Sequence, residues 1–152
     1  MELFRITTRK WMNSAFDGEG ARLVGGRWTS AGRRAVYTAS STSLAILETL
    51  AHVDTQSMPD LVVFRLEVPE DLDRTEVLIE DLPKGWRTVP GPQELTAIGD
   101  EWIAAGETAL LVVPSALVPI EANVVINPEH DDFLELDISQ PFDLPLDKRL
   151  LS

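Results

Sequence analysis

The sequence contains no cysteine, which excludes both a disulfide framework and chemistry that depends on a thiolate. Long hydrophobic runs are missing as well. The longest, such as residues 109–113, are far shorter than the roughly 20 apolar residues that a bilayer-spanning helix needs. The first five residues lack the basic and then apolar pattern of a secretory signal. We therefore expect a cytoplasmic protein that does not associate with membranes.

Histidine is scarce, because only His52 and His130 are present in 152 residues. Glu48 and His52 stand four residues apart and would share a helix face, but a metal site needs three or more ligands, so no metal is expected. The chain has no G-x-S-x-G elbow, and so few histidines argue against a Ser-His-Asp hydrolase. Paired carboxylates for glycoside hydrolysis stay open, since 25 acidic residues offer many pairs.

The glycines near the N-terminus do not form a known phosphate-binding loop. A G-x-G-x-x-G fingerprint that starts at Gly18 would place its third glycine on Leu23, and no strong strand precedes the run. A Walker loop is absent too. The sequence therefore argues against a Rossmann fold or a P-loop nucleotide-binding protein.

Charge is distributed unevenly along the chain, whose net charge is -12. Residues 1–40 contain seven basic and three acidic residues, a net charge of +4, whereas the remainder contains six basic and 22 acidic residues. A chain this acidic repels nucleic acid as a whole, so direct nucleic-acid binding is not expected. Its N-terminal quarter can still receive a small anion.

The hydrophobic pattern predicts a single α+β domain over residues 1–152, with short strands forming a split platform and two main helices. The helix after Ser40–Ser43 has the clearest signals, because these hydroxyls supply an N-cap and the apolar residues repeat with helical spacing. A second helix over residues 93–105 should end at Gly106. The run 61–68 should be a central strand, and 10–22 a loop with one helical turn. Other strands are expected at 2–8, 34–39, 75–79, 109–113, 123–126 and 133–138, with a surface strap at about 141–152.

The residues that remain for chemistry are arginine, tyrosine, glutamate and serine. Arg27 follows two glycines, Tyr37 lies in a predicted strand, and Glu48 lies at the border of the first helix. A guanidinium can clamp a diphosphate, an aromatic ring can stack on a base, and a carboxylate can stabilise an oxocarbenium-like transition state. The set suits cleavage of a glycosidic bond in an anionic, nucleotide-like substrate.

Seven segments, in order along the chain, resemble the motifs of the RES-domain toxins of bacterial toxin-antitoxin systems, a family named for its Arg, Glu and Ser. They are residues 3–6, 15–22, 25–28, 37–39, 44–48 and 113–116, and Asn123 together with 127–130. Thr29 departs from the pattern, because the family usually has Asn after Arg-Trp. The resemblance implies a fold related to ADP-ribosyltransferases. It also implies growth arrest through degradation of NAD+, by hydrolysis or phosphorolysis, or through modification of a cellular protein, with NAD+ as substrate and no separate cofactor.

The resemblance also implies roles for individual residues. Arg27, Tyr37 and Glu48 would be catalytic, with Arg27 anchoring phosphate and ribose, Tyr37 packing on nicotinamide and Glu48 as the catalytic carboxylate. The NAD-binding set would add Arg5 as a second anion contact, and Ser115 and Asn127 as hydrogen-bonding residues. Structural roles compete with these: Ser115 and Asn127 both adjoin prolines and could simply form turns or caps.

The family implies a partner as well, an Xre-type helix-turn-helix antitoxin that blocks the active site, with homo-oligomers as one option through that complex. Two other functions stay open. One is an ADP-ribosyltransferase that modifies a protein, and the other is a noncatalytic module whose acidic surface docks a basic protein.

Overall fold

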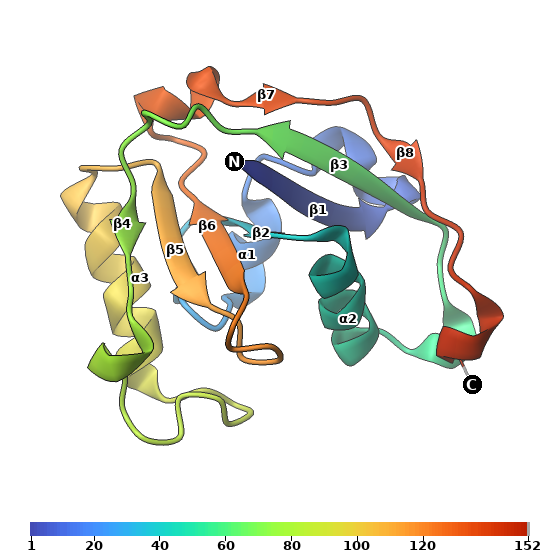
Figure 1. Cartoon of the computed structure of the whole chain (residues 1–152), viewed down its shortest axis with the longest axis horizontal. Helices are drawn as coiled ribbons and strands as arrows, with labels where there is room; N and C mark the ends of the chain where they lie inside the picture. The colour runs from blue at the N-terminus through green and yellow to red at the C-terminus, as the bar shows by residue number, and fades with distance from the viewer. Residues whose placement is uncertain (152) are drawn as a thin grey trace.

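The computed structural model describes residues 1–151, in which β-strands form one curled sheet in the order β4-β5-β6-β2-β1-β3-β7, with β8 also pairing with β3 (Figure 1). The strands are β1 (Glu2–Thr8), β2 (Val36–Ala39), β3 (Leu61–Glu67), β4 (Thr75–Glu76), β5 (Leu110–Pro114), β6 (Ala122–Ile126), β7 (Asp137–Ile138) and β8 (Phe142–Asp143). The α-helices are α1 (Glu19–Val24), α2 (Thr42–His52) and α3 (Gln93–Ala105). Five 3-10 helices are η1 (Arg9–Ser14), η2 (Thr55–Ser57), η3 (Ile79–Asp81), η4 (Asp131–Glu135) and η5 (Lys148–Leu151).

The sheet changes direction where β2 meets β1. Seven residue pairs join β1 to β3 and four join β2 to β6, but a single pair, Phe4 with Ala39, joins β1 to β2. In Figure 1, β1 and β3 lie across the view, whereas β4, β5 and β6 lie closer to its vertical axis. The strand platform is therefore split in two halves that meet at β2, as the sequence predicts.

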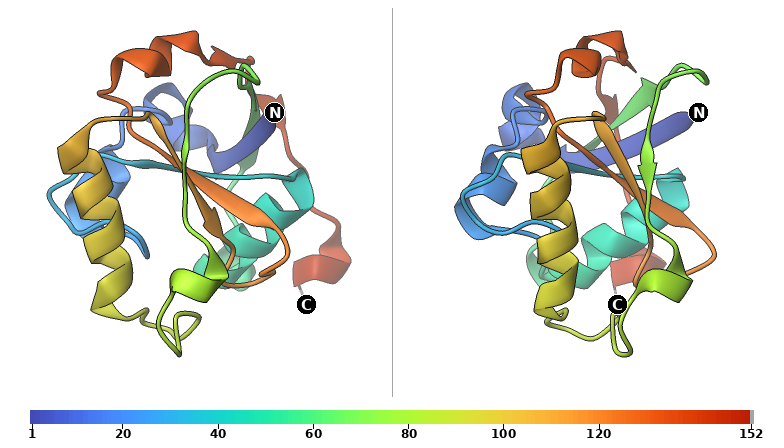
Figure 2. Two further views of the ribbon diagram at one scale, coloured as in Figure 1. Left: turned by 60° about the vertical axis from the view of Figure 1, so that its left-hand side comes forward. Right: turned by 90° about the vertical axis from the view of Figure 1, so that its left-hand side faces the viewer.

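The two longer helices pack against different halves of the sheet and lie apart in Figure 1 and in the left view of Figure 2. Leu44 and Ala45 of α2 pack on Ala39 of β2 and on apolar residues of β1. Leu95 and Trp102 of α3 are buried in a second cluster with strands β5 and β6. A third cluster contains residues of β1, β2, β3, β5 and β6 and of the segment after η1. Because each helix covers only part of the sheet, the surface between them is where side chains of β2, β5 and β6 can meet a ligand.

Both predicted helices are confirmed, and local signals explain why. The hydroxyl oxygen of Ser41 accepts a hydrogen bond from the Leu44 amide at 3.0 Å and so caps α2. Helix α3 ends at Gly106, whose φ of 62° suits glycine and closes the last turn. The strand predicted at 2–8 is confirmed residue for residue as β1.

The prediction that residues 61–68 form a central strand is wrong. The middle of the sheet is β2, whereas β3 pairs with β1 on one side and on the other only with the two-residue strands β7 and β8. Four successive residues of β3 are nevertheless buried, from Leu61 to Phe64. The apolar run therefore indicates that both faces of β3 are buried, because neighbouring loops and short helices cover them. It does not indicate that β3 lies at the centre of the sheet.

Three irregular segments also differ from expectation. The segment 10–22, predicted as a loop with one helical turn, contains most of η1 and the start of α1, while 133–138 holds the end of η4 and only the short strand β7. The expected strap pairs with β3 through β8 and ends in η5, and its last residue, 152, lies outside the described part. No helix within residues 1–151 is long and apolar enough to cross a membrane.

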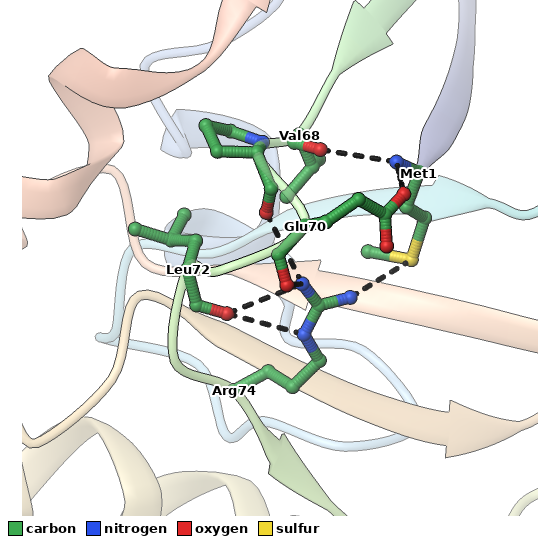
Figure 3. A network of polar contacts seen from close by, with 6 residues as sticks. Met1, Val68, Glu70, Leu72 and Arg74 are labelled. Atoms are coloured by element: carbon green, nitrogen blue, oxygen red, sulfur yellow. Dashed lines mark hydrogen bonds and ion pairs between the residues drawn. The ribbon is translucent and has the colours of Figure 1, made fainter.

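The connection from β3 to β4 is fastened to the start of the chain (Figure 3). The terminal amine of Met1 donates to the Val68 carbonyl at 3.0 Å and to the carboxylate of Glu70 at 2.6 Å. The guanidinium of Arg74 donates to the Leu72 carbonyl and to other carbonyls of the same loop. These bonds fix the segment that carries the chain across to β4 at the far edge of the sheet.

Candidate active site

Glu48 lies on α2 and points toward the end of β5 and the start of β6. One carboxylate oxygen, Oε2, accepts a hydrogen bond from Asn123 Nδ2 at 2.9 Å, and Oε1 accepts a longer one from Ser115 Oγ at 3.4 Å. The Glu48 side chain is half-buried, so one side of it remains open to solvent or to a ligand. The three residues are far apart in sequence, and the fold brings them together.

Both donors to Glu48 are themselves held in place. Ser115 is fully buried just after β5, and its Oγ accepts hydrogen bonds from the amides of Leu117 and Val118 at 3.2 and 3.1 Å. Because those amides occupy its acceptor positions, the hydroxyl proton of Ser115 is left to donate to Glu48. Asn123 Nδ2 also donates to the Thr38 carbonyl at 3.1 Å. The carboxylate therefore faces donors whose orientation is set by the backbone.

The charge state of Glu48 reflects two opposing effects. Burial raises the pKa of the carboxyl group above its ordinary value, while the hydrogen bonds from Asn123 and Ser115 lower it, as does the nearby charge of His52. Both partners donate, and a carboxylate accepts better than a carboxylic acid. Burial outweighs the donors, so the net pKa of Glu48 is raised; in its ionised form the carboxylate is oriented by both donors and can stabilise positive charge developing on a substrate.

Tyr37 supports the glycine-rich loop that carries Arg27. Its hydroxyl group forms a 2.8 Å hydrogen bond with Thr29 Oγ1 and accepts one from the Trp28 amide at 3.2 Å. Burial raises the pKa of the Tyr37 hydroxyl. Gly26 leaves room for this contact, because a Cβ atom there would lie 2.4 Å from the tyrosine oxygen. Tyr37 is thus a structural support of the loop as well as a candidate ligand-binding residue.

Arg27 is held by the loop of residues 83–92. Its Nη1 atom donates to the carbonyls of Trp86 and Thr88 at 2.9 and 3.0 Å, and the loop passes so close that a Cβ on Gly91 would lie 2.9 Å from the same nitrogen. These two bonds leave Nε and Nη2 of Arg27 available, and the described residues provide no carboxylate within ion-pair distance of it. The guanidinium is oriented and still able to bind an anion.

Sheet register relates the Arg27–Tyr37 pair to the Glu48 group. Ala39 pairs with Asn123 and Tyr37 with Val125, so Tyr37 and Asn123 lie diagonally on the same face of adjacent strands. Such diagonal neighbours have Cα atoms roughly 7 to 8 Å apart. The two groups therefore adjoin each other on one face of the sheet.

Two surface cavities lie elsewhere. One of about 420 Å³ is bounded by the segment after β4 and by residues 119–122, and one of about 450 Å³ lies beside the C-terminal segment and Arg9. Neither includes Arg27, Tyr37 or Glu48. The candidate site is thus defined by hydrogen bonds and sheet register. Among residues 1–151, no three His, Asp or Glu side chains come together as metal ligands.

The structure places Arg5 away from this group. Arg5 Nε donates to the Ala15 carbonyl at 2.6 Å and Nη1 to the backbone carbonyl of Tyr37 at 2.9 Å. Along β1 its side chain alternates to the face of Leu3, which packs with Ala15, and not to the face that carries Phe4 and α2. Burial lowers its pKa to about 10, opposed by the charge of Asp17. These contacts give Arg5 a structural role, and its predicted role as a second anion contact stays a prediction.

Asn127 also lies apart from Glu48. It follows the far end of β6, where its amide donates to the Ala109 carbonyl at 2.9 Å and its Oδ1 accepts from the Glu129 amide at 3.0 Å. The asparagine that reaches Glu48 is Asn123, at the other end of the same strand. The predicted role of Asn127 in binding NAD+ stays a prediction. The sequence signal that could have identified Asn123 is that it is a polar residue near the start of the short apolar strand β6.

Comparison with known proteins shows the family to which the chain belongs. The model of the RES domain family matches residues 2–147, nearly the whole chain. The chain therefore belongs to the RES-domain toxins. It is 40% identical over 152 residues to "Toxin Res" of Yersinia enterocolitica, with 99% of each chain covered.

Two further relatives are informative. The chain is 40% identical over 134 residues to the "Prs ADP-ribosylating toxin" of a Sphingobium species, covering 85% of this chain and 83% of that one. Its fold is similar to that in the crystal structure of the M. tuberculosis MbcT–MbcA toxin-antitoxin complex, with a TM-score of 0.78. That likeness covers 94% of this chain and 83% of the other at 20% identity, and it confirms the expected fold.

Proposed function

We propose that this protein is the toxin of a toxin-antitoxin system and arrests growth by cleaving the bond between nicotinamide and ribose in NAD+. The observation that carries the proposal is the half-buried Glu48 carboxylate, held by two donors on the sheet face that also bears Tyr37. Arg27 stands at the other side of Tyr37 with free guanidinium donors. This order matches a substrate with a cationic base, a ribose and a diphosphate.

In the proposed reaction, the bond from the ribose C1′ to the nicotinamide nitrogen breaks, and the bonding electrons leave with the base as neutral nicotinamide. Positive charge then develops on the ribose, where the ionised Glu48 stabilises it or orients a ribose hydroxyl. A water molecule or inorganic phosphate forms the new bond to C1′ through oxygen. With water, the products are ADP-ribose, nicotinamide and one proton.

Asn123 and Ser115 hold the carboxylate in the orientation that this step needs, since each donates to a different oxygen of Glu48. The ring of Tyr37 would pack against nicotinamide, while its hydroxyl stays bound to the loop of Arg27. Arg27 would bind the diphosphate through Nε and Nη2, the donors that its loop contacts leave free.

The second candidate is transfer of ADP-ribose to a cellular protein, with the same residues in the same roles. The name of the Sphingobium relative, an ADP-ribosylating toxin at 40% identity, favours it. By analogy with the toxin-antitoxin complex that shares the fold, we also propose an antitoxin partner, of the Xre type, that covers this face.

The test is to incubate purified protein with NAD+, with and without inorganic phosphate, and to identify the products. Loss of NAD+ without any protein acceptor supports glycohydrolase or phosphorylase activity, and the phosphate arm separates these two. Labelled NAD+ that is consumed only in the presence of cell extract, with label entering a protein, supports the transferase instead.

The matched variants are Glu48→Gln and Glu101→Gln. Glu101 is an exposed carboxylate on α3, away from the site. We expect E48Q to lose both NAD+ consumption and toxicity while it remains folded, and E101Q to retain them. An active E48Q protein would show that the reaction does not depend on this carboxylate.

A further inference from the structure

The loop of residues 83–92 contacts both parts of the candidate site. The carbonyls that hold Arg27 belong to Trp86 and Thr88, on either side of Arg87. The side chain of Arg87 is exposed, and its Nε donates to the Ala116 carbonyl at 2.7 Å. Arg27 is therefore bound to the backbone of the short stretch of loop to which Arg87 belongs.

Arg87 resembles Arg27 in lacking an acidic partner. The ion pairs within residues 1–151 occupy arginines 9, 22, 33, 34 and 149, although the chain has 25 acidic residues to offer. Arg87 instead binds carbonyls, that of Ala116 and, at 3.5 Å, that of Leu117. Of the five N–H donors of a guanidinium, these contacts use two in each arginine, so three remain in each. Both cations are oriented but not neutralised.

Each arginine also adjoins a segment that carries a residue of the candidate site. Ala116, which binds Arg87, directly follows Ser115, which donates to Glu48. Arg27 adjoins Trp28, whose amide donates to Tyr37. Both positive charges thus adjoin the candidate site, in a chain that is otherwise strongly acidic.

We propose that Arg87 is a second anion-binding residue of this site, and that it and Arg27 bind the two phosphates of a dinucleotide's diphosphate. The inference rests on the proposed function and specifies how that substrate class is recognised. Two guanidiniums on one loop match two linked phosphates, whereas a nucleoside without phosphate gains nothing from them. Arg87 then contributes to the affinity for ADP-ribose. This affinity can be measured without any chemical step.

The experiment is calorimetric titration of ADP-ribose into wild-type protein and the variants Arg87→Ala and Arg87→Gln. Glutamine retains an N–H donor for the Ala116 carbonyl but removes the charge, so it separates binding of phosphate from support of the turn. We expect both variants to bind ADP-ribose at least about tenfold more weakly, since each loses charge-assisted hydrogen bonds. The control is Lys84→Ala, an exposed cation on the same loop, which should change the affinity by less than about twofold because it removes only a solvent-screened charge.

Three results would overturn the inference. The first is an R87Q protein that binds ADP-ribose as tightly as wild type, because Arg87 would then have only a structural role. The second is a K84A protein that binds ADP-ribose as weakly as R87A, because a general effect of positive charge would then explain the loss of affinity. A wild-type protein that does not bind ADP-ribose overturns it too. Failure of the proposed function is a separate result, namely wild-type protein that leaves NAD+ intact under every acceptor condition.

Discussion

Asn123→Ala is the substitution that most directly tests the geometry of the candidate site. It removes the 2.9 Å hydrogen bond from Nδ2 to Glu48 Oε2 and leaves the Ser115 contact, a longer bond of 3.4 Å, as the remaining one. Hydrogen bonds to charged groups contribute about 1.5 to 3 kcal/mol. Glu48 is only half-buried, so water can replace part of the lost interaction, and we take the lower end of this range.

A loss of about 1.5 kcal/mol corresponds to about a tenfold fall in kcat/KM at neutral pH. The pH profile should move as well. The Asn123 hydrogen bond lowers the pKa of Glu48 against the effect of burial, so its removal raises that pKa further. Because the proposed reaction uses the ionised carboxylate, the acidic limb of kcat/KM should shift toward higher pH.

The assay is the initial rate of NAD+ consumption across the pH range, and Asn127→Ala is the control. Asn127 follows the other end of β6 and holds the turn to Glu129 through its side chain. We expect N127A to lower the melting temperature with little effect on kcat/KM. The opposite pattern, with N127A inactive and N123A unchanged, would refute the assignment of Asn123 and restore Asn127 to the site.

Three further substitutions test other contacts. Gly26→Ala places a Cβ 2.4 Å from the Tyr37 hydroxyl oxygen, so we expect at least about a tenfold loss of activity with the fold retained by circular dichroism; unchanged activity would contradict a fixed tyrosine. Gly99→Ala brings a Cβ within 1.7 Å of the Trp28 carbonyl oxygen, so α3 must shift, and denaturant unfolding should show a destabilisation of about 2 kcal/mol or more; a loss below about 0.5 kcal/mol would show that α3 moves freely. Glu48→Gln should gain stability relative to wild type as pH rises above the ordinary glutamate pKa of 4.5, because the raised pKa makes the folded protein bind more protons there; a difference that does not vary with pH would exclude the burial effect.

The parts of the fold that sequence predicts well are those whose signals are local. Helix α2 follows a serine cap and α3 ends at a glycine, and both carry apolar residues at helical spacing, so both were predictable. The place of β3 was not, because an apolar run indicates burial whatever provides the cover. Strand order depends on contacts between distant segments, and no local pattern encodes it.

The candidate site shows the same division. Glu48, Tyr37 and Arg27 could be named from residue type and spacing, but the choice between Asn123 and Asn127 depends on the direction of β6. Because β6 runs antiparallel to β2, its first residues lie beside the end of β2 from which α2 starts. That pairing brings Asn123, and not Asn127, to the helix that carries Glu48.

Strand β2 links every part of the site, although it is only four residues long. Its Tyr37 side chain supports the Arg27 loop, and its Thr38 carbonyl accepts from Asn123, the donor to Glu48. The Thr38 hydroxyl, buried on the other face, donates to the Val124 carbonyl at 2.7 Å and fastens β2 to β6. A small shift of β2 therefore moves the anion-binding and the carboxylate groups together. Since a single residue pair joins β2 to β1, the register of β2 depends mainly on β6, and substitutions at that interface should affect catalysis more than their distance from the substrate suggests.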